Sequence, residues 1–136
     1  MKIQFLDTNI LLRHLLADLP KQSQAATAYF NRIEKGEVKV RISELVVFET
    51  VFTLERYYKQ TKAKIREVIL PLIELPNIVL PGKKRLRETF DLYVNLNLPF
   101  ADSYHAILMK HLKLGEIITF DREFDRISGI TRVLPK

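Results

Sequence analysis

Four acidic residues stand in apolar surroundings along the chain: Asp7, Glu49, Asp102 and Asp121. Asp7 follows the apolar run 3–6 directly, and Asp121 follows a second run at 117–120. A carboxylate at the end of a buried parallel strand lies at the sheet edge where open α/β folds bind ligands. Carboxylates gathered there repel one another unless a hard cation such as Mg²⁺ holds them. The pattern therefore predicts a metal site that activates water for attack on phosphorus.

Three of these acids also have an ordinary structural explanation. Asp7 and Asp121 each precede a predicted helix and could cap its first turn. Asp102 falls in the first turn of another helix, where the dipole favours a negative charge. These explanations do not exclude metal binding, because a capping residue at the end of a parallel strand lies at the same sheet edge.

Glu49 is harder to explain without a cation. It lies in a helix that is apolar on nearly all sides, and it shares a face with Leu45 and Phe52. We expect this face to point inward, and a buried carboxylate without a partner is very costly. A buried salt bridge to Arg13 or Arg56 is the alternative to metal binding.

Alternating apolar runs and helical patterns define the expected architecture. Strands are predicted at 2–6, 38–42, 77–80, 117–120 and 131–134, and helices at 9–17, 20–35, 43–59, from 63 until Pro71 or Pro76, 83–96, 99–112 and 122–127. Nearly continuous apolar strands between helices are typical of a parallel sheet covered on both faces. We expect an α/β three-layer sandwich with a central, mainly parallel sheet of four to five strands flanked by helices. The length predicts a single domain, 1–136.

Composition excludes several classes of protein. There is no cysteine, which excludes disulfides and thiolate zinc sites and fits a cytoplasmic location. No apolar run approaches the roughly 18 residues of a membrane span. A glycine-rich phosphate loop is absent, which argues against nucleotide triphosphate hydrolysis.

The net charge of +6 is concentrated in two basic groups. One contains Arg56, Lys59, Lys62, Lys64 and Arg66, and the other contains Lys83, Lys84, Arg85 and Arg87. Each group could simply be a solvated helix face, but basic clusters also attract phosphate backbones. A basic surface together with an acidic pocket favours nucleic acid and a divalent metal.

Four segments together resemble the PIN-domain family: Asp7-Thr8-Asn9, residues 43–49 ending in Glu49, residues 100–106 around Asp102, and residues 119–125 around Asp121. The resemblance covers essentially the whole chain, and the short single domain looks most like the VapC-type toxins. It implies a Mg²⁺- or Mn²⁺-dependent endoribonuclease that hydrolyses RNA with a metal-activated water. It also implies a homodimer and inhibition by a cognate antitoxin protein.

The resemblance also assigns roles to individual residues. Asp7, Glu49, Asp102 and Asp121 match the family's catalytic, metal-binding acids. Asn9 and Thr119 match residues that support the first and the last acid, and Asp125 is a candidate fifth acid. We assign Lys83, Lys84, Arg85 and Arg87 to the RNA backbone as a hypothesis from their clustering.

Three alternatives remain open at this point. A metal-dependent phosphatase using Asp7 as nucleophile would usually carry a second aspartate two residues later, where this chain has Asn9. A phosphoacceptor domain would usually pair two acids after the first strand. A non-catalytic PIN-like module that binds RNA or protein would keep the fold without cleavage.

Overall fold

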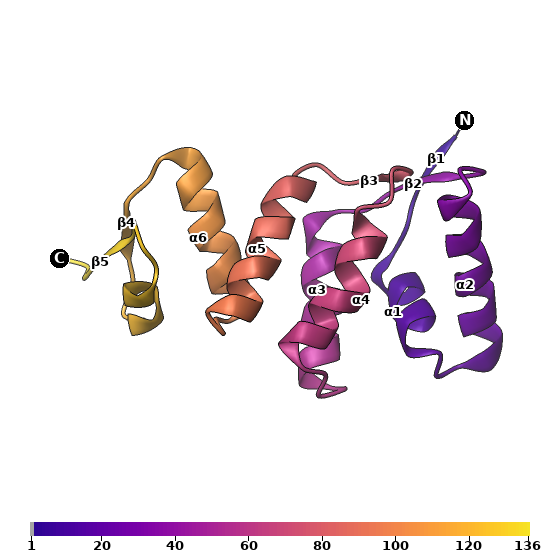
Figure 1. The fold of residues 1–136 in the computed structure, drawn as a ribbon, viewed down its shortest axis with the longest axis horizontal. Coiled ribbons are helices and arrows are strands. Elements are labelled where there is room, and N and C mark those ends of the chain that lie inside the picture. Colours follow the sequence, from indigo (N-terminus) through magenta and orange to yellow (C-terminus); the bar gives the residue numbers. More distant parts are fainter. Residues whose placement is uncertain (1) are drawn as a thin grey trace. The chain divides into compact units, whose positions relative to one another are not determined.

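The computed structural model describes residues 2–136 of the chain (Figure 1). Two compact units account for the fold, unit 1 from Met1 to Lys83 and unit 2 from Lys84 to Lys136. Each unit has its own parallel strands and its own apolar core, and each is described by itself.

Unit 1 contains a three-stranded parallel sheet in the order β1-β2-β3. Its elements are β1 (Ile3–Phe5), α1 (Thr8–Leu16), α2 (Pro20–Glu34), β2 (Lys39–Arg41), α3 (Glu44–Arg56), α4 (Lys62–Ile73) and β3 (Ile78–Val79). Two helices separate each pair of successive strands, which lets the chain return and run parallel. Helix α1 packs against α2 and α3, and α3 packs against α4.

Local sequence signals begin the helices of unit 1. Pro20 is the first residue of α2, where its missing N–H costs nothing. Ser43 and Thr61 cap α3 and α4 by accepting hydrogen bonds from the backbone N–H groups of Val46 and Lys64, both at 3.2 Å. Helix α4 continues past Pro71, which was expected to bend or end it, and ends two residues later at Ile73. Pro71 has no N–H to donate to the carbonyl of Glu67 four residues earlier.

The cap of α3 matters for the site because this helix carries Glu49. Replacing Ser43 by alanine should lower the free energy of unfolding by about 1 kcal/mol, since the N–H of Val46 loses its acceptor. Ser43→Thr retains a hydroxyl acceptor and is the matched control. Urea unfolding of both variants checks the prediction, and equal stability of Ser43→Ala and wild type would contradict it.

The core of unit 1 is formed by aliphatic side chains from all its layers. Leu11, Ile33, Val40, Val47 and Ile69 are each at most 1% exposed. His14 lies at the margin of this core, stacked on Phe30 with ring centroids 4.6 Å apart. Its Nδ1 lies 2.8 Å from the Thr27 hydroxyl oxygen.

Burial lowers the pKa of His14 below its ordinary value of 6.5. The folded state therefore resists protonation more strongly than the unfolded chain does. The neutral ring contributes stability above pH 6.5, and this contribution is lost as the pH falls from there to the folded pKa. Urea unfolding between pH 8 and pH 5 should show a steeper loss for wild type than for His14→Gln. Identical slopes would contradict the prediction.

Unit 2 contains most of helix α5 (Lys83–Asn95), then α6 (Phe100–Leu112), β4 (Glu116–Ile118), the 3₁₀ helix η1 (Arg122–Arg126) and β5 (Thr131–Val133). Strands β4 and β5 pair in parallel, with Ile117 opposite Arg132. One apolar cluster joins α6 to η1 through Leu98, Ala106, Phe124 and Ile127. Phe90 and Tyr93 of α5 pack against Phe100 of α6, with ring centroids 4.9 and 5.2 Å apart.

The predicted α/β class and the parallel pairing of strands are confirmed. The expected burial of the first and fourth strands is not observed, because β1 and β4 are edge strands in their own sheets. Ile3 and Phe5 are 50% and 61% exposed, and Ile118 is 71% exposed. Within residues 2–136, every helix is too short or too polar to cross a membrane.

Candidate functional site

Asp7 lies at the carboxyl end of β1, where the backbone leaves the sheet and enters α1. Its backbone is extended, and its side-chain Oδ1 accepts a hydrogen bond of 2.8 Å from the N–H of Thr8. Asp7 is thus the helix cap that its position suggested, and its carboxylate is exposed. The cap fixes the side chain, and the second carboxylate oxygen stays available to a ligand.

Glu49 is linked to the start of α1 by a hydrogen bond within unit 1. The hydroxyl of Thr8, which is 7% exposed, donates to Oε2 of Glu49 at 3.2 Å. Thr8 follows Asp7 in sequence. The dipeptide Asp7-Thr8 therefore contains one predicted acid and binds a second, Glu49 of α3, through a hydrogen bond. The sequence interpretation missed this role, and the only signal for it was a hydroxyl residue next to Asp7.

The expectation that Glu49 points inward is wrong. Glu49 is exposed, and Leu45 and Phe52 on the same face are 62% and 53% exposed. Helix α3 instead buries the opposite face through Val46, Val47, Thr50, Val51 and Leu54. Among residues 2–136, Glu49 forms neither of the alternative salt bridges, since Arg13 pairs with Asp18 at 2.8 Å and Arg56 lies over the ring of Phe52.

A groove of about 690 Å³ opens beside Asp7 in unit 1. Asn9 and Arg13 of α1 line it, together with Phe5 of β1 and Tyr29 of α2. Asn9 lies in the first turn of α1 and is exposed, so its amide faces the surroundings of Asp7 rather than the core.

The other two acids lie in unit 2, where the carboxylate of Asp121 is close enough to act on the carboxyl group of Asp102. Asp102 is in the first turn of α6, and Asp121 follows β4. Burial raises the pKa of Asp102, and the nearby carboxylate of Asp121 raises it further. His105 acts in the opposite direction, whereas Glu123 adds to the rise. Glu123 is a second residue that the sequence interpretation missed, although it stands two residues after Asp121.

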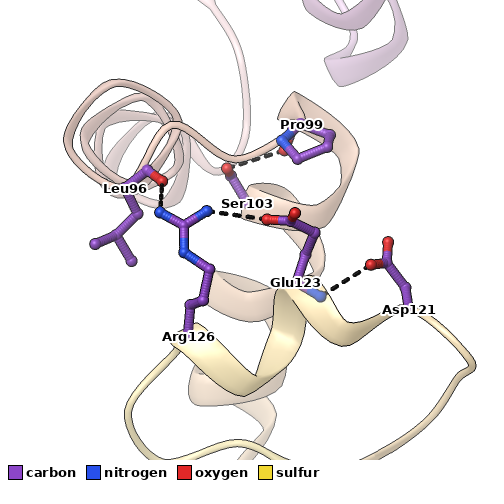
Figure 2. Close-up of polar contacts among 6 residues, drawn as sticks. All are labelled: Leu96, Pro99, Ser103, Asp121, Glu123 and Arg126. Carbon is purple, nitrogen blue, oxygen red and sulfur yellow. Dashed lines mark hydrogen bonds and ion pairs between the residues drawn. The ribbon is translucent and has the colours of Figure 1, made fainter.

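Polar contacts hold the loop around Asp121 in place (Figure 2). The Oδ1 of Asp121 accepts a hydrogen bond of 2.9 Å from the N–H of Glu123 and so caps η1. Arg126 donates to the carboxylate of Glu123 at 2.9 Å and to the carbonyl oxygen of Leu96. Ser103, which is next to Asp102, donates to the carbonyl of Pro99 at 3.0 Å. These bonds anchor η1 to the chain that leads into α6.

Thr119 and Asp125 have different surroundings. The hydroxyl oxygen of Thr119 accepts a hydrogen bond of 3.0 Å from the N–H of Asp121, which fixes the backbone of that acid. Asp125 pairs with Arg132 of β5 at 3.2 Å. The carboxylate of Asp125 is thus engaged in joining η1 to β5, as that of Glu123 is engaged by Arg126, which leaves Asp102 and Asp121 as the interacting pair of acids.

The basic group at the start of α5 is not uniform. Lys83 is partly buried, and its Nζ donates to the carbonyl oxygen of Leu75 at 2.8 Å. Burial lowers the pKa of Lys83, and the nearby Glu74 opposes this shift. Lys84 and Arg87 are exposed, whereas Arg85 is partly buried. Lys84 and Arg87 are therefore the members of this group best suited to meet an RNA backbone.

The predicted acids of unit 1, Asp7 and Glu49, and those of unit 2, Asp102 and Asp121, have side chains that suit a hard divalent cation. Their side chains offer carboxylate oxygens, which Mg²⁺ and Mn²⁺ prefer, and two acids of unit 2 already lie close enough to repel. Within residues 2–136, neither unit alone brings three or more metal-ligand side chains together. Each unit thus offers two of the predicted carboxylates, Asp7 and Glu49 in unit 1 and Asp102 and Asp121 in unit 2, and Mg²⁺ is usually held by one or two carboxylates.

Comparisons with known proteins agree with this chemistry. Residues 4–130 match the family model described as PIN domain. The chain is also similar to a protein of Aquifex aeolicus (strain VF5) named VapC ribonuclease. The two are 30% identical over 135 residues, which cover 98% of this chain and 97% of that protein.

Proposed function

Because the chain belongs to the PIN-domain family, we propose that it is a metal-dependent endoribonuclease and the toxin of a toxin–antitoxin pair. The full-length similarity to a protein named VapC ribonuclease supports both parts of this proposal. The proximity of Asp102 and Asp121 is the observation that carries it: Asp102 lies in the first turn of α6, Asp121 caps η1, and these two helices share one apolar cluster. Two carboxylates that repel each other are best explained by a shared cation.

In this proposal Asp7, Glu49, Asp102 and Asp121 hold Mg²⁺ or Mn²⁺ together, and both units form one nuclease domain. The positions of Asp7 and Asp121 support it, because each follows a parallel strand at its carboxyl end. The single family match across residues 4–130 supports it as well, since it spans both units.

The residues next to the four acids would orient the acidic side chains, and the cation would act through its charge. Thr8 holds the carboxylate of Glu49 through its hydroxyl, and the N–H of Thr8 fixes Asp7. Thr119 and Arg126 keep the loop of Asp121 in place. A bound divalent cation would lower the pKa of water and offset the charge that develops on the phosphate. A bound cation would favour the ionised form of Asp102, because its attraction would offset the repulsion from Asp121.

The proposed partners follow from the family. The substrate is RNA in the cytoplasm, and the activity is controlled by a separately encoded antitoxin protein. We also propose a homodimer. Co-expression with the product of a short adjacent reading frame should restore growth if the chain alone is toxic.

The proposal is tested by incubating labelled RNA with the purified protein and Mg²⁺ or Mn²⁺. We expect internal cleavage that stops with a chelator and returns when the metal is added back. Single-stranded DNA of the same sequence is the control for substrate class. Metal-independent RNA binding without cleavage would favour a binding module, and release of phosphate from a monoester would favour a phosphatase.

A further inference from the structure

The end of α3, the start of α4 and the turn between them form the most basic stretch of unit 1. Residues 56–66 contain five basic side chains and no acidic one, although the whole chain has a net charge of only +6. Arg56, Lys59 and Lys64 are exposed. A local positive charge of this size attracts a polyanion by itself, independently of a metal bound at the four acids.

Exposed aromatic rings are interleaved with these charges. Tyr57 is 73% exposed and Phe52 is 53% exposed, so both rings are open to solvent. The guanidinium of Arg56 lies 5.3 Å from the centre of the Phe52 ring. This pair offers a flat cationic surface, and Tyr57 offers a second ring next to it in sequence.

The backbone of the turn is well defined. Lys59 adopts a left-handed conformation with φ of 52°, and the N–H of Gln60 bonds to the carbonyl of Leu54 at 3.0 Å. The hydroxyl of Tyr58 donates to Asp18 at 3.4 Å, which ties the turn to the end of α1. Thr61 caps α4. The rings and charges are thus presented from a fixed turn, so little ordering is needed on binding.

We propose that residues 52–66, the aromatic–basic turn, bind single-stranded RNA. A base stacks on the ring of Tyr57, and Lys59 and Lys64 contact the adjacent phosphates. Base stacking on exposed aromatic residues beside cations is the usual way in which proteins hold single strands. The inference rests on the proposed ribonuclease function and adds a substrate-binding surface separate from the four acids.

Charge and ring exposure together favour RNA over a protein partner. A protein interface would bury apolar side chains and exclude clustered like charges from its centre. Here residues 52–66 contain five basic side chains and one acid, Glu55, and Tyr57 lies between Arg56 and Lys59 in sequence. A single strand suits the site better than a duplex, because only an unpaired base exposes its face to a tyrosine ring.

The chain has no tryptophan, so Tyr57→Trp introduces a unique fluorescent reporter at the turn. The probe is a 12-nucleotide single-stranded RNA, and the full chain carries Asp7→Asn to prevent cleavage. We expect the RNA to quench the indole at position 57. Leu134→Trp is the matched control, because Leu134 is 54% exposed and lies outside the basic stretch.

Fluorescence anisotropy of labelled RNA then measures affinity. Tyr57→Ala should weaken binding about 5- to 30-fold, because one stacked base is lost. Lys59→Glu with Lys64→Glu should weaken it further and reduce its dependence on salt. Lys21→Glu with Lys35→Glu changes the charge equally at exposed positions of unit 1 and should have a smaller effect.

The outcomes separate this inference from the proposed function. RNA cleavage and binding that survive unchanged in the Tyr57 and lysine variants would overturn the inference and leave the ribonuclease proposal standing. Failure of the wild-type chain to bind or cleave any RNA would overturn both. Unchanged RNA affinity with a changed oligomeric state in Tyr57→Ala would assign the turn to a protein interface instead.

Discussion

In the Asp7→Asn variant, RNA cleavage is expected to fall at least about 100-fold with the fold intact. The substitution removes one negative oxygen donor from the proposed cation site, and interactions with a catalytic cation are worth several kcal/mol. Asparagine keeps the side-chain oxygen that caps α1 through the N–H of Thr8. The thermal midpoint should therefore change little while the activity is lost.

The measurement compares cleavage of labelled RNA by the two proteins after identical purification. Glu34→Gln is the matched control, because it also removes one carboxylate but lies exposed at the end of α2. It should cleave like wild type. Equal cleavage by all three proteins would point to a contaminating nuclease. If Asp7→Asn lost its folded structure, its loss of cleavage would no longer support a role for Asp7 in the site.

Asp102→Asn should change activity and stability in opposite directions. Cleavage should again fall at least about 100-fold, because a second donor is lost. In the metal-free protein, however, the ionised Asp102 is unfavourable, since burial and Asp121 raise its pKa. The neutral side chain relieves this repulsion, so the thermal midpoint at pH 7 should rise by about 1–2 °C.

The sign of the stability effect depends on pH in a defined way. The folded pKa of Asp102 lies above the ordinary value of 3.8, so its cost appears as the pH rises from 3.8 through the folded pKa. Below pH 3.8 both states are protonated and the gain from asparagine should vanish. Differential scanning calorimetry in a chelator at pH 7 and pH 3.5 checks this. A lower midpoint for Asp102→Asn at pH 7 would contradict it.

Helices were the part of the fold that sequence predicted best. Serine and proline at the start of α3 and α2 set those boundaries through local chemistry that does not depend on the rest of the chain. The end of α4 was less accurate, because the helix continues to Ile73 although Pro71 lacks the N–H of a helical hydrogen bond. Parallel pairing also followed from the alternation of strands with helices.

Burial was predicted less well than secondary structure. An apolar run such as Ile3–Phe5 indicates a strand but not whether it lies at the edge of its sheet. The same limit applies to α3, which is apolar on nearly every side. Periodicity alone therefore could not show that Val47 faces the core and that Glu49 is exposed.

The candidate site was predictable in its acids but not in their supports. Asp7 and Asp121 could be read from the ends of apolar runs, and both are helix caps in the structure. The link from Thr8 to Glu49 spans 41 residues, and no local pattern reveals a contact over such a separation. Arg132, which engages Asp125, is likewise on another element and was not foreseen.

The central claim is that acids from both units hold one cation. Isothermal titration of Mn²⁺ into wild type, Asp7→Asn and Asp102→Asn tests this most directly, because it needs neither the RNA target nor turnover. We predict one set of sites in wild type and affinity at least about tenfold weaker in each variant. Mn²⁺ binding as tight as wild type in either variant would contradict the claim, since it would assign the cation to one half of the acids alone.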